Sequence, residues 1–564
     1  MKNFHYLTGS LALACACVCA SSFAAEIDAG AMLNKYRQEL APGFVQLPMA
    51  AQNAAQEKFN GFQIDNLPVA AQQLAKDYVA YQVGQEVIVK SLMGYLERHL
   101  QDQGFPYVFQ RVEEKLEANA PIKLKAFKVS FGKVIVNNNS GLDAELAERV
   151  LSYGIESGAP VNRAQLERNS TILSEIEGIS NTYQMKPGQQ LGVTDLVSQL
   201  EIGRLYNGSA TLDNSGSDVL GRATLRGDIA LNNKLGQGDV FRAFGLITEH
   251  SQMAGVDASF LATPSGWRLG TSFSQFTYDY GTTNSLTGLS TRYEGASANT
   301  GLSATFPLVR YEFGRHTFSA NLDRARSQGD ATVGSSTQVN HLSDTATHKL
   351  GLSVFGIQAL GNDLTGSYQA VFSSGRARQD VASAALQDAG SSQQMGHFNK
   401  LFLSGSLSKV LTLADEQVVA SVAANVQLAN RNLPGSEKMY FGGMSQMRAW
   451  VSQAVPTDEA LYAEFKLEKQ LTSQARIALF AEVAQFRQNH TNYLAAVDNL
   501  SVSTAATNKD RMSDLGISWQ YQVDPQTQLK GFVAHKLSND PSVNTKSLPD
   551  ASRSRAWLSL TRLF

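Results

Sequence analysis

The chain has 564 residues, of which 43% are hydrophobic and 17% charged, and its formal net charge is −2. The balanced charge gives no support to a nucleic-acid partner, and the length exceeds what a single domain needs. Beyond the N-terminus there is no run of about 18 apolar residues, which argues against membrane-spanning helices. A membrane-spanning barrel stays open, because its strands show only alternation of apolar and polar residues.

Residues 1–24 have the pattern of a secretory signal peptide. Lys2 precedes an apolar core over residues 11–20, and Ser22 and Ala24 stand at the expected cleavage site. The core is too short to span a bilayer as a helix. A lipoprotein signal is the weaker alternative, because no cysteine follows a convincing lipoprotein motif.

The chemistry available to the mature chain is narrow. All three cysteines lie inside the expected signal peptide, which leaves no thiol for disulfides, metal binding or nucleophilic catalysis. The nine histidines are scattered, and there is no His-Glu-x-x-His motif, no Gly-x-Ser-x-Gly elbow and no P-loop. We therefore expect no enzymatic activity, no cofactor and no metal site.

A short helix and a linker are expected over residues 25–57. Met32, Leu33, Tyr36 and Leu40 share one face of a helix over residues 29–40. A Pro-Gly pair ends this helix, and a linker rich in Gln, Ala and Pro follows. From these residues alone we expect a loosely packed helix near the N-terminus.

Residues 58–132 and 133–206 each show the order strand, helix, helix, strand, strand. Two such units of about 70 residues in tandem make an internal repeat of architecture. This order predicts that each unit is an α+β domain, with a short sheet covered by helices on one face. Its edge strands are then able to accept a strand from a partner, and the candidates are residues 106–112 and 182–185.

From residue 207 to residue 564 the helical period disappears. About 16 alternating strands follow, an even number that suits an all-β antiparallel bacterial barrel. Short connections alternate with long polar ones, and the last strand ends on an aromatic residue, Phe564. A soluble β-sandwich would show similar alternation, so the pattern alone does not separate the two. The long polar connections are 281–289, 327–345, 375–397 and 488–510.

The stretch from Met439 to Trp450 differs from an ordinary exposed loop. It is rich in methionine and aromatic residues and holds the pair Gly442 and Gly443 and a single arginine, Arg448. If the flanking strands close into a barrel, such a loop belongs in the lumen, where a buried arginine needs an acidic partner. A strand with a glycine bulge is an equally compatible alternative.

Three runs of residues resemble a known family. Residues 158–168 (GAPVNRAQLER), with EGI and KPG downstream, resemble the second POTRA domain of outer-membrane translocators. The unit before them is similar to a more diverged first POTRA domain. The run LDNSGS…GR…LNNKLGQGD over residues 212–239 closely resembles the start of the barrel in TpsB transporters of two-partner secretion. The resemblance covers nearly the whole mature chain.

The resemblance implies two elements that close the pore. One is a plug helix, which residues 29–40 match in position. The other is an inward-folded loop, here residues 433–456, whose family motif Val-Arg-Gly-Tyr/Phe is Met-Arg-Ala-Trp at residues 447–450. The family arginine pairs with an acid on the inner wall, two strands further on. Alternation points Glu482 inward at that position, in place of the usual aspartate, and Ala449 replaces the motif glycine.

The resemblance also implies a function. A TpsB transporter exports one large TpsA-type exoprotein, unfolded and without ATP, through an outer-membrane barrel, with its POTRA domains in the periplasm. The implied partners are this exoprotein, outer-membrane lipid and the barrel assembly machinery, which recognises the terminal Phe564, and the chain is expected to be a monomer. The alternatives are an assembly factor of the same superfamily and a passive porin. The strand residues expected to meet the exoprotein are Tyr107, Phe109, Tyr183 and Met185.

Overall fold

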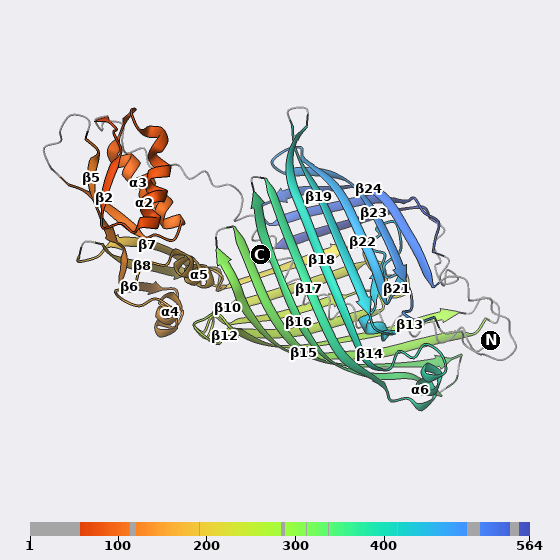
Figure 1. The fold of residues 1–564 in the computed structure, drawn as a ribbon. Helices are drawn as coiled ribbons and strands as arrows, with labels where there is room; N and C mark the ends of the chain where they lie inside the picture. Colours follow the sequence, from red (N-terminus) through yellow and green to blue (C-terminus); the bar gives the residue numbers. More distant parts are fainter. Residues whose placement is uncertain are drawn as a thin grey trace.

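The computed structural model describes most of the chain from residue 57 to its end (Figure 1). The expected signal peptide lies outside the described residues, as does the expected plug helix with Met32, Leu33, Tyr36 and Leu40. Two small α+β units are followed by a large barrel, which confirms the predicted fold class. The described ranges are 57–112, 120–190, 192–283, 288–311, 313–334, 336, 338–361, 363–413, 416–492, 508–541 and 552–564.

The first α+β unit packs two helices on one side of a three-stranded sheet. The strand order is β2-β5-β4, with β2 and β5 parallel and β4 antiparallel at an edge. Leu96, Leu100 and Leu124 are fully buried where the helices meet the sheet. The elements are β1 (Glu57–Lys58), β2 (Phe62–Asp65), α2 (Val69–Val79), η1 (Ala80–Gln82), β3 (Glu86–Val87), α3 (Val89–Asp102), β4 (Tyr107–Arg111) and β5 (Ile122–Lys128).

The second unit repeats this plan, with sheet order β6-β8-β7 and β7 at an edge. Its helices begin where the sequence supplies caps, because Asp143 accepts a hydrogen bond from the backbone of Leu146 and Asn162 from that of Gln165. The elements are β6 (Ser130–Asn139), α4 (Ala144–Leu151), α5 (Arg163–Ser174), β7 (Ile179–Pro187) and β8 (Val193–Ile202).

Sixteen antiparallel strands close into a barrel within the described residues, so the β-sandwich alternative is wrong. The last strand, β26, pairs with the first, β9, and the backbones of Gly208 and Phe564 exchange two hydrogen bonds of 3.1 Å. The strands are β9 (Tyr206–Asp213), β10 (Thr224–Asn232), β11 (Val240–Ile247), β12 (Ser251–Leu261), β13 (Arg268–Thr283), β14 (Ser290–Tyr311), β15 (Gly314–Val333), β16 (Val339–Gly361), β17 (Leu364–Gln379), β18 (Gly396–Leu413), β19 (Glu416–Ala429), β22 (Glu459–Gln470), β23 (Ala475–Arg487), β24 (Lys509–Asp524), β25 (Thr527–Lys536) and β26 (Ser554–Leu563).

Alternation along each strand separates an apolar outer wall from the lumen. On β23, Leu479 and Val483 face outward and are 57% and 47% exposed, whereas Phe480 and Glu482 face inward and are buried. A barrel in lipid needs this arrangement, because its outer side chains meet acyl chains and its inner ones meet water or other protein. Among the described residues, no helix is long and apolar enough to cross a membrane.

Strands β13 to β16 extend further than the sequence predicts. Much of the connection expected at 327–345 is strand, because β15 runs to Val333 and β16 starts at Val339. The extension of β15 carries Gln328, Asp330 and Thr332 on its outer face, so the outward apolar residues that mark a membrane strand are missing there. The connection expected at 375–397 holds a short helix, α6 (Ala382–Ala389).

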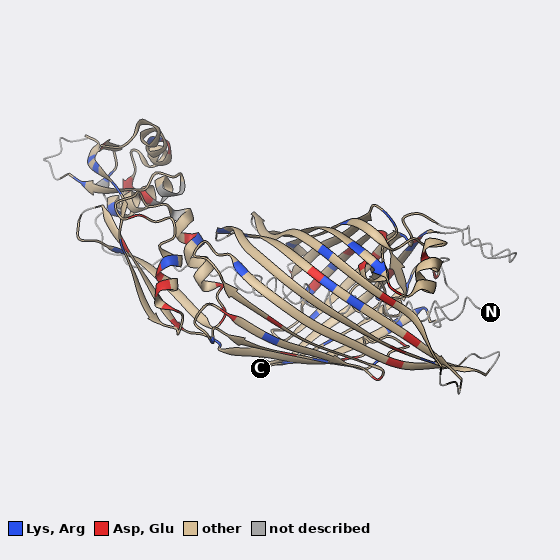
Figure 2. Cartoon of the chain, turned by 90° about the horizontal axis from the view of Figure 1, so that it is seen from below, with Lys and Arg blue, Asp and Glu red and all other residues tan. Residues whose placement is uncertain are grey.

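Charged residues of both signs interleave along the barrel (Figure 2). Many of them face inward on neighbouring strands, where opposite charges pair across the sheet, as Arg242 on β11 does with Asp257 on β12 at 3.9 Å. The lumen is therefore polar wherever no loop fills it.

Candidate functional site: the inward loop and its anchors

Residues 430–458 connect β19 to β22 and fold into the barrel; we call them the inward loop. Their start and end pair as a small two-stranded sheet, β20 (Met439–Phe441) with β21 (Val455–Thr457), separate from the barrel sheet. Residues 442–454 belong to no strand, so the alternative of a barrel strand with a glycine bulge is wrong.

The glycine pair of the inward loop shapes its tip. Gly442 and Gly443 have φ angles of +102° and +104°, which favour glycine. A Cβ atom at Gly442 would lie 2.0 Å from the carbonyl oxygen of Val451, so a side chain has no room there. Ala449, at the position where the family motif has glycine, is not among the residues with positive φ, and an alanine is compatible with its backbone.

Arg448 at the tip contacts two acids of the inner wall. Its Nη2 lies 2.7 Å from Oε2 of Glu464 on β22, and its Nη1 lies 3.2 Å from Oε1 of Glu482 on β23. The guanidinium also lies over the Phe480 and Phe532 rings, 4.5 and 5.5 Å from their centroids. Such a partly desolvated cation on aromatic faces is held by electrostatic attraction as well as by the ion pairs.

The two acids belong to a row of three carboxylates that faces the lumen. Glu464, Glu482 and Asp514 are successive cross-strand partners on β22, β23 and β24. The tip of the loop brings backbone N–H donors to this row: Met447 and Arg448 donate to Glu482 at 3.1 and 2.9 Å, and Ala449 donates to Asp514 at 2.9 Å. Acidic side chains on neighbouring strands repel each other and destabilise the wall. The guanidinium of Arg448 and the N–H donors of the loop offset this repulsion.

The tip also packs into an apolar cluster shared with the wall. Trp450 is 1% exposed and lies in this cluster with Phe441 from the loop and with Phe532 and Trp557 from the wall. The indole nitrogen of Trp557 donates to the carbonyl of Arg448 at 2.8 Å. The loop tip is therefore bound to the wall by charge, backbone hydrogen bonds and apolar contact together.

The base of the inward loop has its own anchors. Glu437 is almost fully buried between two lysines of the wall, 3.1 Å from Nζ of Lys349 on β16 and 2.7 Å from Nζ of Lys400 on β18. The next residue, Lys438, forms a 2.7 Å ion pair with Asp458 at the end of the loop. Two buried carboxylates thus face three lysines at the base.

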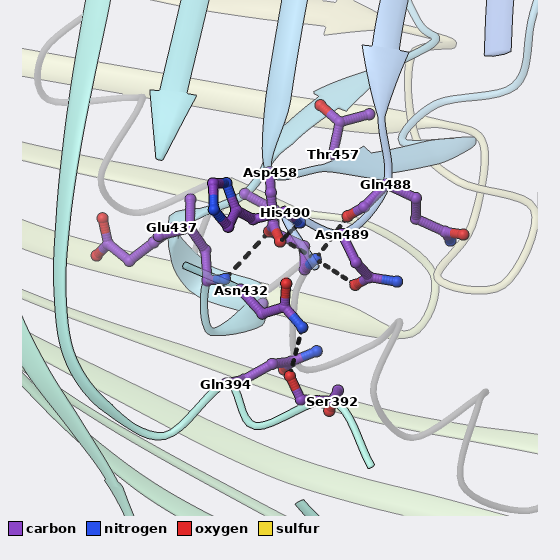
Figure 3. A network of polar contacts seen from close by, with 12 residues as sticks. Ser392, Gln394, Asn432, Glu437, Thr457, Asp458, Gln488, Asn489 and His490 are labelled. Atoms are coloured by element: carbon purple, nitrogen blue, oxygen red, sulfur yellow. Dashed lines mark hydrogen bonds and ion pairs between the residues drawn. The ribbon is translucent and has the colours of Figure 1, made fainter. Parts of the chain in front are cut away.

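Figure 3 shows how further polar residues gather around this base. The second carboxylate oxygen of Asp458 accepts the N–H of His490 at 2.9 Å, and Lys438 also donates to the carbonyl of Gln488 at 2.9 Å. Asn432 donates to the carbonyl of Ser392, from the segment after α6. The network joins the loop to connections on both sides of it.

A third polar contact joins the second α+β unit to the barrel. Arg168 on α5 donates to the carbonyls of Ser265 and Pro307 at 2.8 and 3.2 Å. Glu175, at the end of α5, pairs with Arg310 on β14 at 2.8 Å. Burial lowers the pKa of the Arg168 guanidinium, which nonetheless stays charged. These contacts fix the unit against the ends of β12 to β14 (Figure 1).

The structure places the predicted strand residues differently in the two units. Tyr183 and Met185 on the edge strand β7 are exposed. Phe109 on the edge strand β4 is buried in the core of its own unit, and Tyr107 packs against that core. Only the backbone edge of β4 is accessible at Phe109, whereas β7 also presents side chains.

The comparisons with known proteins bear on this architecture. Residues 192–506 match the family model described as haemolysin secretion/activation protein ShlB/FhaC/HecB. The chain belongs to this family. It is a TpsB transporter of the bacterial outer membrane, and it secretes an exoprotein.

Individual relatives of this family member are distant, and one of them covers nearly its whole length. The heme/hemopexin transporter protein HuxB of Haemophilus influenzae (strain 86-028NP) is 22% identical over 545 residues, which span 92% of this chain and 89% of HuxB. The outer membrane transporter CdiB of Dickeya dadantii (strain 3937) is 23% identical over 349 residues, 60% of this chain and 59% of CdiB.

Solved structures of two transporters share the fold. CdiB from Escherichia coli superimposes with a TM-score of 0.65 at 14% identity and covers 96% of this chain and 98% of its own. CdiB from Acinetobacter baumannii gives 0.62 at 14% identity, with 98% and 99% covered. At such identity the likeness concerns the fold alone.

Sequence reasoning named Arg448 and Glu482 and missed most of their surroundings. Glu464 on β22 and Asp514 on β24 stand at alternate positions whose side chains face inward, as Glu482 does on β23. Counting alternate positions along these two strands could therefore have predicted both acids from the sequence. For Glu437 no comparable signal exists, because its lysine partners come from β16 and β18, far along the chain. Among the described residues, no group of three or more His, Cys, Asp or Glu side chains is placed to hold a metal ion.

Proposed function

We propose that this transporter recognises one large exoprotein in the periplasm and passes it, unfolded, through the barrel without nucleotide hydrolysis. The observation that carries the proposal is the inward loop, which occupies the lumen and is bound at Arg448 to two carboxylates of the wall. Family membership favours export over the two alternatives, an assembly factor and a porin. HuxB is described as a heme/hemopexin transporter and CdiB as an outer membrane transporter. These likenesses therefore support export of an exoprotein and do not identify which one.

The tip of the inward loop acts as the gate in this proposal. The exoprotein needs the space that the tip occupies, so the contacts of Arg448 must break and re-form during export. Breaking a buried ion pair by removing one partner costs about 3–5 kcal/mol, so Arg448→Ala would leave the gate loose. Gly442, Gly443 and Trp450 shape and seat the same tip.

A cysteine pair tests the gate directly, because all three cysteines of the chain lie within the expected signal peptide. Ser452 in the loop donates a hydrogen bond to the carbonyl of Ser215, between β9 and β10. Oxidising Ser452→Cys paired with Ser215→Cys should stop secretion of the co-expressed exoprotein, and reduction should restore it. The single-cysteine chains serve as controls. Undiminished export by the cross-linked chain would show that the tip need not move.

Recognition is assigned to the sheet edges of the POTRA units, where an extended segment of the exoprotein adds a strand. The exposed Tyr183 and Met185 on β7 favour this edge, and β4 offers its backbone alone. Replacing both side chains with glutamate should weaken binding of the exoprotein's N-terminal domain to the purified transporter. Tyr81→Glu, on an exposed residue of η1, is the matched control. Equal loss of binding in both variants would remove β7 from the proposal.

The plug helix and the energy source complete the proposal. Deleting residues 26–41 should raise single-channel conductance in planar bilayers, and an unchanged conductance would refute the plug. Folding of the exoprotein outside the cell drives the net movement in this proposal. A cargo variant that cannot fold should therefore stall in the barrel, where it is detected by cross-linking. Phe564 is assigned to recognition by the assembly machinery, and the working unit is a monomer.

A further inference from the structure

A group of cationic side chains lies on the outer wall of the barrel, just beyond its apolar band. On β15, Phe318, Ala320 and Leu322 face outward in turn, and the next outward residue is Arg324. On β17 the outward series likewise passes from Phe372 through one serine to arginine. These charged side chains lie on the outer surface of the barrel, so neither the pore nor the gate uses them.

The two arginines, Arg324 and Arg376, stand in one row across the sheet with His348 between them. Thr300 on β14, Arg324 on β15, His348 on β16 and Arg376 on β17 are successive cross-strand partners, and all four are exposed. Adjacent strands lie about 4.8 Å apart, so the two arginine backbones flank the histidine at a separation of roughly 10 Å. A headgroup seated on His348 is within reach of both guanidinium groups.

The two arginines have no acidic partner within the described part of the chain. Neither Arg324 nor Arg376 forms an ion pair or a side-chain hydrogen bond there. One position further out, by contrast, Arg326 is bound to Asp344 at 2.7 Å. Two unpaired cations that flank one strand repel each other, and an anionic ligand between them relieves that cost.

The row borders a hollow in the outer wall. The hollow has a volume of about 410 Å³, and Thr300, Arg324 and His348 line it beside three leucines. The leucines belong to the next row toward the periplasm, so the hollow has a cationic end and an apolar end. They are Leu302, Leu322 and Leu350, each between 42% and 57% exposed.

The height of the row on the barrel matches the boundary of the outer leaflet. Arg324 stands ten residues from Gly314, where β15 begins on the side of the POTRA units. Ten residues rise about 33 Å along a strand, and a tilt near 40° reduces this to roughly 25 Å. That is the thickness of the apolar band of an outer-membrane barrel, so the row lies at the outer-leaflet headgroups.

We propose that this hollow binds a phosphate-bearing lipid of the outer leaflet. Arg324 and Arg376 hold the phosphate, since a guanidinium presents a planar fork of donors that fits phosphate oxygens. An acyl chain of the lipid covers the three leucines below. The site anchors the wall formed by β14 to β17, which also carries Lys349, a partner of the base of the inward loop.

The test uses the full chain, purified in detergent and titrated with diphosphorylated lipid A, with bound lipid counted by native mass spectrometry. Replacing Arg324 and Arg376 together with glutamine should weaken binding by about tenfold or more, since the charge-assisted hydrogen bonds of both guanidinium groups to the phosphate are lost. Arg292→Gln is the matched control, because Arg292 is an outward arginine of β14 already paired with Asp279 and Glu294. Folding is checked by the mobility of unheated protein in SDS gels.

Three further outcomes decide the proposal. Equal binding by the double variant and the Arg292 control would overturn it. Equal binding of lipid A with its phosphates removed would reduce the hollow to an ordinary lipid-facing surface. Displacement of lipid A by millimolar inorganic phosphate alone would mark a free-anion site and contradict the lipid assignment. If the double variant fails to fold, Arg324→Gln and Arg376→Gln are measured separately, and each should weaken binding.

Discussion

Lys438 and Asp458 form a 2.7 Å ion pair that joins the start and the end of the inward loop. Both side chains are buried, and Glu437, next to Lys438, is bound to two lysines of the wall. Arg448 makes separate contacts at the tip. The loop is therefore anchored at two levels, its tip and its base, and the charges that hold each level come from different strands.

Glu437→Gln should loosen the base of the inward loop. It leaves Lys349 and Lys400 without their shared carboxylate, and removing one member of a buried ion-pair group costs about 3–5 kcal/mol. We expect faster amide exchange over residues 430–440, measured by mass spectrometry on the purified transporter. Glu416→Gln, at an exposed ion pair with Lys469, is the control and should change nothing in this segment. Unchanged exchange in the Glu437 variant would contradict the anchor.

Gly442→Ala should displace the tip. The added Cβ would lie 2.0 Å from the carbonyl oxygen of Val451, and the φ of +102° is strained for alanine. Overpacking of this kind costs about 1–3 kcal/mol, so Arg448 should become accessible to trypsin in the folded transporter. Gly281→Ala is the control, because a Cβ added there would have no other atom within 4 Å and the φ of this residue is ordinary. Continued protection of Arg448 would refute the account of the tip.

Gly208→Ala should weaken the closure of the barrel. A Cβ there would lie 2.4 Å from the carbonyl oxygen of Asp228 and 2.6 Å from the ring of Phe564. We expect a loss of about 1–3 kcal/mol, seen as a lower temperature at which the compact form in SDS gels converts to the unfolded form. Gly227→Ala, whose nearest neighbour is 3.6 Å from the added atom, should behave like the original chain.

Glu97→Gln should stabilise β4 at neutral pH. Burial raises the pKa of the Glu97 carboxyl, and the hydrogen bond that it accepts from the backbone of Phe109 opposes this only in part. A carboxyl with a raised folded-state pKa contributes its full stability below the unfolded pKa of about 4.3, and loses it as the pH rises through the folded value. The ionised form is therefore the less stable one at pH 7.

Amide exchange of Tyr107–Arg111, corrected for intrinsic rates, measures this effect. The glutamine variant should exchange more slowly at pH 7, and the difference should vanish near pH 4, where the carboxyl is largely protonated. Glu86→Gln in β3 is a control. If the glutamine variant still exchanged more slowly at low pH, the packing of the glutamine would explain the effect and the charge of Glu97 would not.

The sequence by itself determined the classes of element and the overall plan. The caps Asp143 and Asn162 mark helix starts because their side chains satisfy local N–H groups. Alternation in residues 475–487 places Glu482 inward whatever its neighbours are, because successive side chains on a strand point to opposite faces. Such features depend on residues close together in the chain, so they can be predicted from one segment at a time.

Only the tertiary structure decided which charges meet. Arg448 is shared between Glu464 and Glu482, and Glu437 lies between lysines of β16 and β18, because barrel closure brings these strands around one loop. The row of Arg324, His348 and Arg376 likewise depends on strand register, which is set by hydrogen bonds between distant segments. Parity along a strand is local, whereas register, closure and the path of a loop are properties of the whole barrel.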